Sequence, residues 1–252
     1  FRDGQIFFRP YGGLFRSALR AFRHIFVQND SSRNLLKSIG IEQVSVAGDT
    51  RFDRVYEIAQ QAKRLPEIER FAADAPVFIA GSTWPPDEEL LVGLIERYPD
   101  VKFIVAPHEI DPARIEKFCE RISRPALRYT QLTPQSDLAA AGVLFVDTIG
   151  ILSSVYRYGR WGYIGGGFGA GIHNTLEAAT FGLPLAFGPR YGKFREARDL
   201  VTLRGAASIA SAEELERWFA GLHDDPDATG RSGTICKEYV LQHKGATARI
   251  MD

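Results

Sequence analysis

The residues best suited to chemistry lie in one glycine-rich segment. Five glycines fall between Gly165 and Gly171, after a short apolar run, and His173, Asn174 and Glu177 follow where a helical pattern begins. Glycines let a phosphate approach the backbone, and free N–H groups at a helix start attract anions. The Glu177 carboxylate, one turn further, is spaced to accept both hydroxyls of a ribose. The segment predicts a nucleotide-phosphate site, with a flexible loop before a capped helix as the alternative. Its spacing is not that of the dinucleotide fingerprint.

A second candidate segment follows an earlier apolar run. Gly81, Ser82 and Thr83 stand between this run and a helical pattern that opens with two prolines and three acids. The two hydroxyls can bind a phosphate or cap the helix. An ordinary capped turn is the alternative to a ligand site here.

Further polar residues follow other predicted strands. Asp147 and Gly150 come after a third apolar run, where the carboxylate either caps a helix or binds a sugar hydroxyl. His108 follows a fourth run, although a lone histidine is as often structural as functional. Three cations follow the apolar run at 184–187: Arg190, Lys193 and Arg195. They either neutralise a ligand's phosphate or carboxylate, or they face solvent. No cluster has the spacing of metal ligands, so we expect no metal.

Apolar runs alternate with amphipathic stretches along the whole chain. The runs predict strands at 24–28, 44–47, 77–80, 102–106, 143–146, 161–165, 184–187 and 207–210. The stretches between them predict helices at 13–22, 31–39, 53–65, 86–98, 111–121, 148–158, 174–181, 194–203 and 212–222. Near-continuous apolar strands alternating with helices indicate an α/β fold with parallel sheets, in which ligands bind at the carboxyl ends of strands.

The number of strand–helix units indicates one complete domain and part of another. A charged, proline-containing stretch ends at residue 76, and about six units follow it, while only two or three precede it. We expect the remnant of an N-terminal domain at 1–50, a linker at 51–75 and a doubly wound Rossmann-like domain at 76–252. The only methionine is Met251 and the chain opens at Phe1, so we expect the sequence to lack its own start.

Composition excludes several classes of protein. The 252 residues are 45% hydrophobic, which is too much for a disordered chain. They carry 31 basic and 31 acidic residues, so bulk charge does not favour nucleic acid. Two cysteines make no disulfide scaffold, and no apolar run reaches the ~20 residues of a membrane span. Residues 1–28 hold five arginines against Asp3, which suits either an anionic membrane surface or a helix with a solvated basic face.

Taken together, the motifs resemble one family of GT-B glycosyltransferases, the 3-deoxy-D-manno-octulosonic acid (Kdo) transferases. The resemblance covers essentially the whole chain, and its pieces occur in the family's order. They are Val27-Gln28-Asn29-Asp30, Val46-Ala47-Gly48-Asp49-Thr50-Arg51-Phe52-Asp53, Gly81-Ser82-Thr83, Asp147-Thr148-Ile149-Gly150, and Gly165-Gly166 followed by His173-Asn174-Thr175-Leu176-Glu177.

The resemblance implies an activity and a donor site. Kdo transferases move Kdo from CMP-Kdo to a lipid A precursor in lipopolysaccharide synthesis, with inversion, at the cytoplasmic face of the inner membrane. They need no metal or cofactor. The second domain binds the CMP-sugar, with the glycine loop on the phosphate and Glu177 on the ribose. The donor-binding positions that carry over are Gly81, Ser82, Thr83, His108, Asp147, Gly150, Gly166, His173, Asn174 and Glu177.

The sequence departs from the family pattern before His108 and at Ile151, which follows Gly150 where the family often has a glutamate. The family's Pro-Arg-His appears here as Ala106-Pro107-His108, so a phosphate-binding arginine is missing. The family's catalytic glutamate, a general base in the first domain, has no counterpart, so we name no catalytic residue and expect this chain alone to bind donor without turnover. The alternatives are another GT-B enzyme that uses a UDP-sugar, and a non-catalytic nucleotide-sugar-binding fragment.

Overall fold

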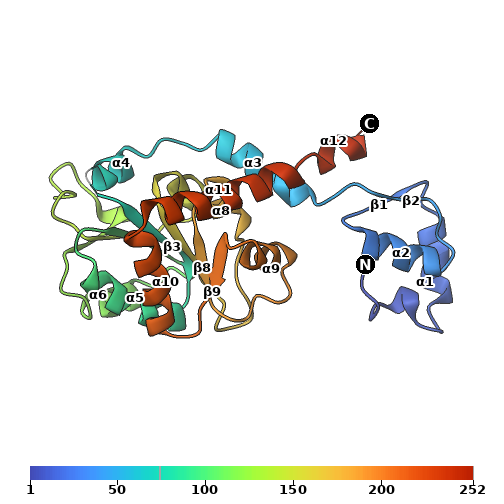
Figure 1. Cartoon of the computed structure of the whole chain (residues 1–252), viewed down its shortest axis with the longest axis horizontal. Coiled ribbons are helices and arrows are strands. Elements are labelled where there is room, and N and C mark those ends of the chain that lie inside the picture. Colours follow the sequence, from blue (N-terminus) through green and yellow to red (C-terminus); the bar gives the residue numbers. More distant parts are fainter. Residues whose placement is uncertain (74, 252) are drawn as a thin grey trace. The chain divides into compact units, whose positions relative to one another are not determined.

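The structure, a computed structural model, describes residues 1–73 and 75–251 and divides into two compact units (Figure 1). The first unit combines Phe1–Glu57 with Leu241–Asp252, and the second is Ile58–Val240. These bounds differ from the expected domains, because most of the expected linker lies in the second unit and residues 241–251 lie in the first. The functional division into acceptor and donor domains stays a prediction.

The first unit is built around one β–α–β motif. Strands β1 (Ile25–Val27) and β2 (Val44–Val46) pair in parallel, and α2 (Asp30–Ser38) connects them. Asn29 begins this helix by accepting a hydrogen bond from the Ser32 N–H at 2.9 Å. A small core joins this motif to the preceding helix. It consists of Leu19, Val27, Leu36, Ile41 and Val44.

The basic, aromatic helix expected at 13–22 is shorter than its pattern. Helix α1 spans Gly13–Arg20, after a 3-10 turn at Ile6–Phe8, and buries Leu19. Phe22 lies beyond the helix and is exposed. Helix α1 therefore ends at Arg20, and Arg23 lies outside it.

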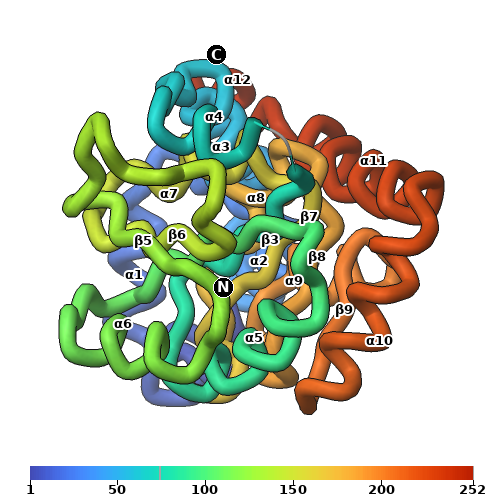
Figure 2. Tube along the Cα trace, turned by 90° about the vertical axis from the view of Figure 1, so that its left-hand side faces the viewer, coloured from blue at the N-terminus to red at the C-terminus, as the bar shows by residue number. Residues whose placement is uncertain are grey.

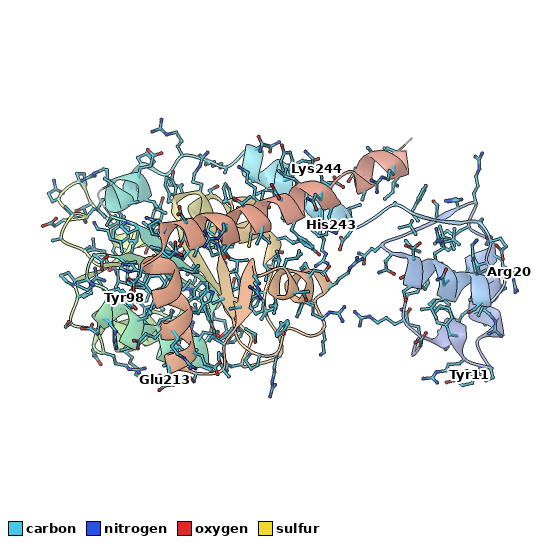
Figure 3. The ribbon with its side chains drawn as sticks, in the orientation of Figure 1. Tyr11, Arg20, Tyr98, Glu213, His243 and Lys244 are labelled. Atoms are coloured by element: carbon cyan, nitrogen blue, oxygen red, sulfur yellow. The ribbon has the colours of Figure 1, made fainter. Side chains whose placement is uncertain are left out.

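A C-terminal segment completes the first unit. Helix α3 (Thr50–Gln60) presents Asp53, whose carboxylate accepts hydrogen bonds from the N–H groups of Gly245 and Thr247 at 2.5 and 2.9 Å. These residues lie between the end of α11 (Pro226–His243) and α12 (Ala246–Met251) or at the start of α12. Lys244 lies over the ring of Tyr56 at 3.9 Å (Figure 3). Side chains far apart in sequence thus hold residues 241–251 to α3.

The second unit contains a seven-stranded parallel sheet. Its order is β5-β6-β4-β3-β7-β8-β9, so the direction in which the chain adds strands reverses beside β3. The strands are β3 (Val77–Thr83), β4 (Lys102–Pro107), β5 (Ala126–Arg128), β6 (Val143–Phe145), β7 (Trp161–Ile164), β8 (Leu185–Phe187) and β9 (Ala206–Ser208). All eight expected strands are present, two in the first unit and six in this sheet, and β5 is additional.

Helices cover both faces of this sheet (Figure 2). One layer holds α5 (Pro85–Arg97), α6 (Pro112–Cys119) and α10 (Ala212–His223), and the other holds α4 (Pro66–Ala72), α7 (Leu152–Val155), α8 (Leu176–Thr180) and α11. Helix α9 (Arg195–Thr202) precedes β9. Phe219 of α10 packs on Phe78 and Trp161 at ring distances of 5.4 and 4.9 Å. Full burial of an aromatic ring contributes about 1.5–3 kcal/mol, so this cluster anchors α10 to the sheet.

Strand β5 and helices α11 and α12 have no counterpart among the elements expected from the sequence. Strand β5 is three residues long, follows Pro125 and pairs only with β6 among the described strands. Helix α11 contains Gly230 and Gly233, which disfavour a helix. A Cβ at Gly233 would lie 2.2 Å from the carbonyl oxygen of Gly182, so glycine here allows close packing that outweighs propensity.

Candidate functional site

The candidate residues gather where the strand order of the sheet reverses. β3 and β7 are neighbours, and Gly81 pairs with Ile164 at their carboxyl ends. The Gly81-Ser82-Thr83 segment therefore lies beside Gly165 and Gly166. This is the position at which doubly wound sheets bind ligands.

The two strand ends touch at the backbone. A Cβ on Gly165 would lie 2.2 Å from the carbonyl oxygen of Ser82, and one on Gly81 would lie 2.0 Å from the hydroxyl of Tyr156. Ser82 has a φ of +55°, in the left-handed region, at a shift in the β3–β4 register. Such a conformation is costly and persists because the surrounding packing imposes it.

Asp87 holds these strand ends together, although no pattern in the sequence singles it out. Its Oδ2 accepts hydrogen bonds from the N–H groups of Trp84 and Gly166, both at 2.9 Å, and its Oδ1 accepts the Tyr163 hydroxyl at 2.6 Å. Asp87 is buried, with 1% of its surface exposed. Burial, together with Asp87 itself, raises the pKa of Tyr163 and keeps that hydroxyl protonated as a donor. An acid in the first turn of α5 looks like a helix cap in sequence, and only the fold brings the glycine loop to it.

Three aromatic rings form a compact group beside Asp87. The Trp84 indole N–H donates to Nε2 of His173 at 3.0 Å, and the two ring planes differ by 8°. The ring of His108 stacks on both, at centroid distances of 4.8 Å to Trp84 and 4.2 Å to His173. The structure thus brings together the two predicted histidines through a tryptophan that sequence reasoning did not select.

The other half of the glycine segment forms the start of α8. Asn174 accepts from the Leu176 N–H at 3.1 Å and donates to the Glu177 carboxylate at 3.0 Å. Burial raises the pKa of Glu177, and the bond from Asn174 offsets part of that effect. Through this hydrogen bond Asn174 and Glu177 form a pair at the helix start. Thr175, which lies between them in the sequence, is 1% exposed, and its hydroxyl has no hydrogen-bond partner among the described residues.

The hydroxyl of Thr83 points to a buried acid. It donates to Glu88 at 3.0 Å, and Arg114 lies 3.4 Å from the same carboxylate. Burial raises the pKa of Glu88, although Arg114 and Thr83 oppose that shift. Thr83 in this structure orders α5 against β3, and Ser82 occupies the strained position.

Asp147 and Gly150 follow β6, which is separated from β3 by β4. The Asp147 carboxylate accepts hydrogen bonds from Arg128 at 2.9 Å and from both the N–H and the hydroxyl of Thr130. Burial alone would raise the pKa of Asp147, but these bonds outweigh it and lower that pKa. The carboxylate thus joins β6 to β5 and caps no following helix. Gly150 has a φ of +90° and open space around its Cα.

The predicted cations differ in their surroundings. The Arg190 guanidinium donates to the carbonyl of Gly169 at 2.7 Å, which places it against the glycine loop. Arg195 pairs with Asp199 at 3.4 Å, and Lys193 is exposed. Of these three cations, Arg190 is the one that contacts the glycine loop.

Metal ligands and membrane-spanning helices are both absent from residues 1–73 and 75–251. Within these described ranges, no group of three or more His, Cys, Asp or Glu side chains is arranged to hold a metal ion. No helix in that part of the chain is both long enough and apolar enough to cross a bilayer.

The parallel sheet, its reversal beside β3 and the glycine loop define the class of the second unit, which has the fold of GT-B glycosyltransferases. The C-terminal CMP-Kdo binding domain of WaaA from Acinetobacter baumannii aligns with a TM-score of 0.61 and 22% identity, over 75% of this chain and 99% of that one. MnaA from S. aureus, in a structure with UDP, aligns with a TM-score of 0.62 and 14% identity, over 96% of this chain and 62% of that one.

The sequence relatives include several Kdo transferases. A 3-deoxy-D-manno-octulosonic acid transferase of Rickettsia bellii is 26% identical over 210 residues, which are 81% of this chain and 49% of the relative. The expected resemblance to the Kdo transferases is confirmed: the chain has homologues among them. It spans about half the length of the curated relatives it matches. No protein-family model matches the sequence.

Proposed function

We propose that this chain carries the donor-binding part of a Kdo transferase, which moves Kdo from CMP-Kdo to a lipid A precursor with inversion. The observation that carries the proposal is the meeting of Gly81–Thr83 with Gly166, His173 and the start of α8 at the reversal of strand order. The WaaA domain that shares this fold is a CMP-Kdo binding domain, which supports CMP-Kdo as the donor. No metal or cofactor has a role in this proposal.

The residues divide the donor between them. The glycine loop and Arg190 receive the phosphate through backbone N–H groups and one guanidinium. Glu177 accepts the ribose hydroxyls, with Asn174 holding its carboxylate in position. His108, directly after β4, stacks on His173 as part of the ring cluster. Asp147 and Gly150 stay predicted donor contacts, although the carboxylate of Asp147 already has three hydrogen bonds.

Nucleotide titration tests the donor class. Calorimetry of the 252-residue chain should give tighter binding of CMP than of UDP. UDP is the competitor to test because the MnaA structure, which has a similar fold, contains it. Tighter binding of UDP would favour the alternative, a GT-B enzyme with a UDP-sugar. Binding of neither nucleotide would contradict the proposed site.

A second titration tests the ribose contact. Glu177→Gln should weaken CMP binding about tenfold, which corresponds to about 1.4 kcal/mol for a lost charged hydrogen bond. The same variant should discriminate less between CMP and dCMP than the unchanged chain does. Glu238→Gln, an exposed acid on α11, is the matched control and should leave both affinities unchanged.

The remaining part of the proposal is a location at the cytoplasmic face of the inner membrane, in contact with anionic lipid. Support comes from the first unit, where Leu14 and Tyr11 are 79% and 75% exposed and Arg20 ends α1. Figure 3 labels Tyr11 and Arg20 in this unit. Apolar side chains beside cations suit an anionic lipid surface. The chain should sediment together with anionic vesicles, and the double variant Leu14→Ser, Arg20→Ser should stay in the supernatant. Equal binding to neutral and anionic vesicles, or no binding to either, would favour the solvated basic face.

A further inference from the structure

The hydrogen bond between Trp84 and His173 fixes where the imidazole can carry a proton. An indole N–H only donates, so Nε2 of His173, 3.0 Å away, must supply the lone pair. The two ring planes are 8° from parallel, which is compatible with a bond close to the imidazole plane, where the nitrogen lone pair lies. A neutral His173 therefore has its proton on Nδ1. Charging it would place a second N–H where the indole N–H already points.

The groups around His173 also disfavour a positive charge. The ring of His108, from the segment after β4, stacks on it at 4.2 Å. Burial and His108 lower the pKa of His173, and the Asp87 carboxylate of α5 opposes them only in part. That carboxylate already accepts three hydrogen bonds from Trp84, Tyr163 and Gly166. From the glycine loop, a Cβ at Gly166 would lie 3.2 Å from Nε2 of His173, so Gly166 packs close to this edge of the ring.

We propose that Trp84 is a positioning residue, which holds His173 as the neutral Nδ1–H tautomer so that it offers an anionic ligand a hydrogen bond and no formal charge. The nature of the ligand rests on the proposed function, whereas the tautomer does not. Charge recognition at this site then falls to backbone N–H groups and Arg190. A neutral donor binds phosphate without titrating near neutral pH, where a free histidine would.

Imidazole nitrogen NMR tests the tautomer directly. In the ¹⁵N-labelled chain at pH 7.5, His173 should show a protonated Nδ1 and a bare, hydrogen-bonded Nε2. Trp84→Phe keeps an aromatic ring for His108 to stack on and removes the indole N–H. In this variant His173 should populate both tautomers and should titrate at higher pH. Trp218→Phe, on α10, is the matched control and should leave the His173 signals unchanged.

Two results would overturn the proposal: a protonated Nε2 in the unchanged chain, or the same single tautomer and the same titration in Trp84→Phe. The first measurement needs no variant, so it decides the question even where Trp84→Phe fails to fold.

Calorimetry with CMP then separates this inference from the proposed function. Trp84→Phe should bind CMP about three- to tenfold more weakly at pH 7.5, the loss of one well-placed hydrogen bond. Equal affinity alongside a changed tautomer would overturn the role of Trp84 in ligand binding. Absence of CMP binding by the unchanged chain would contradict the proposed function, while the imidazole spectra would still decide the tautomer.

Discussion

The carboxylate of Asp87 accepts a hydrogen bond from the backbone N–H of Gly166, 79 residues further along the chain, at 2.9 Å. Trp84 and Tyr163 donate to the same buried group, so three donors from the start of α5, from β7 and from the glycine loop converge on one side chain. The two segments that form the candidate site are therefore held by a single acid.

Replacing Asp87 should destabilise the second unit. Asp87→Asn keeps the shape but sets an NH₂ group against N–H donors, so at least one buried hydrogen bond is lost, at a cost of about 1–3 kcal/mol. Urea unfolding should measure this loss. Asp227→Asn, which replaces an exposed acid in the first turn of α11, is the control. It should change the free energy of unfolding by only a few tenths of the loss expected for Asp87→Asn. Equal stability of the two variants would contradict the role assigned to Asp87.

Gly81 should tolerate no side chain while Tyr156 is present. A Cβ there would lie 2.0 Å from the Tyr156 hydroxyl, and Tyr156 is 2% exposed, so Gly81→Ala should cost about 1–3 kcal/mol through overpacking. Tyr156→Phe removes that oxygen and should recover part of the loss in the double variant. Gly93→Ala, in open space on α5, should instead stabilise by up to ~1 kcal/mol. Strict additivity of the Gly81 and Tyr156 changes in chemical denaturation would contradict the contact.

The contribution of His223 to the stability of the second unit should be larger in mild acid than above neutral pH. Burial alone would lower the pKa of His223, but hydrogen bonds with Asp224 and Asp100 outweigh it and raise that pKa. A raised pKa contributes stability fully below the unfolded value of about 6.5, and that contribution is lost as pH rises through the folded value. His223→Gln should therefore destabilise more at pH 6 than at pH 8.5, by up to about 1 kcal/mol for a partly exposed pair. In an Asp100→Asn background this pH dependence should shrink.

Asp53 should control the order of α12. Its carboxylate accepts bonds from Gly245 and Thr247, so Asp53→Ala should cost about 1 kcal/mol, as for a lost helix cap. Amide hydrogen exchange at 246–251 should accelerate, whereas Glu57→Gln, exposed on the same helix, should leave it unchanged. Burial alone would raise the pKa of Asp53, but those bonds outweigh it and lower that pKa. The contribution is therefore present above the unfolded value of about 3.9 and is lost as pH falls through the folded value.

The strands were predictable because buried parallel strands are apolar on both faces. The segments 77–80 and 161–165 read as continuous apolar runs, and the polar residues after them led to the reversal point of the sheet. That reasoning selected Gly81, Gly166 and His173, which the structure brings close together, while their contact with a donor stays a prediction. The ring stack of His108 on His173 follows from the adjacency of β4, β3 and β7.

Long-range polar partners were not predictable. Asp87 looks like a helix cap, and nothing in its own neighbourhood points to Tyr163 or Gly166. Local sequence predicts a cap or a sugar ligand at Asp147, because its partners, Arg128 and Thr130, lie on or beside a three-residue strand that has no apolar run of its own. Such pairs become neighbours only through register and strand order, which local patterns do not determine.

The return of residues 241–251 to the first unit has a consequence for synthesis on the ribosome. Residues 58–240 form the second unit and are all translated before Leu241 and Gly245, the partner of Asp53. The second unit can therefore fold before α12 is translated. The contacts of Asp53 with Gly245 and Thr247 form only after every residue of the second unit has been made.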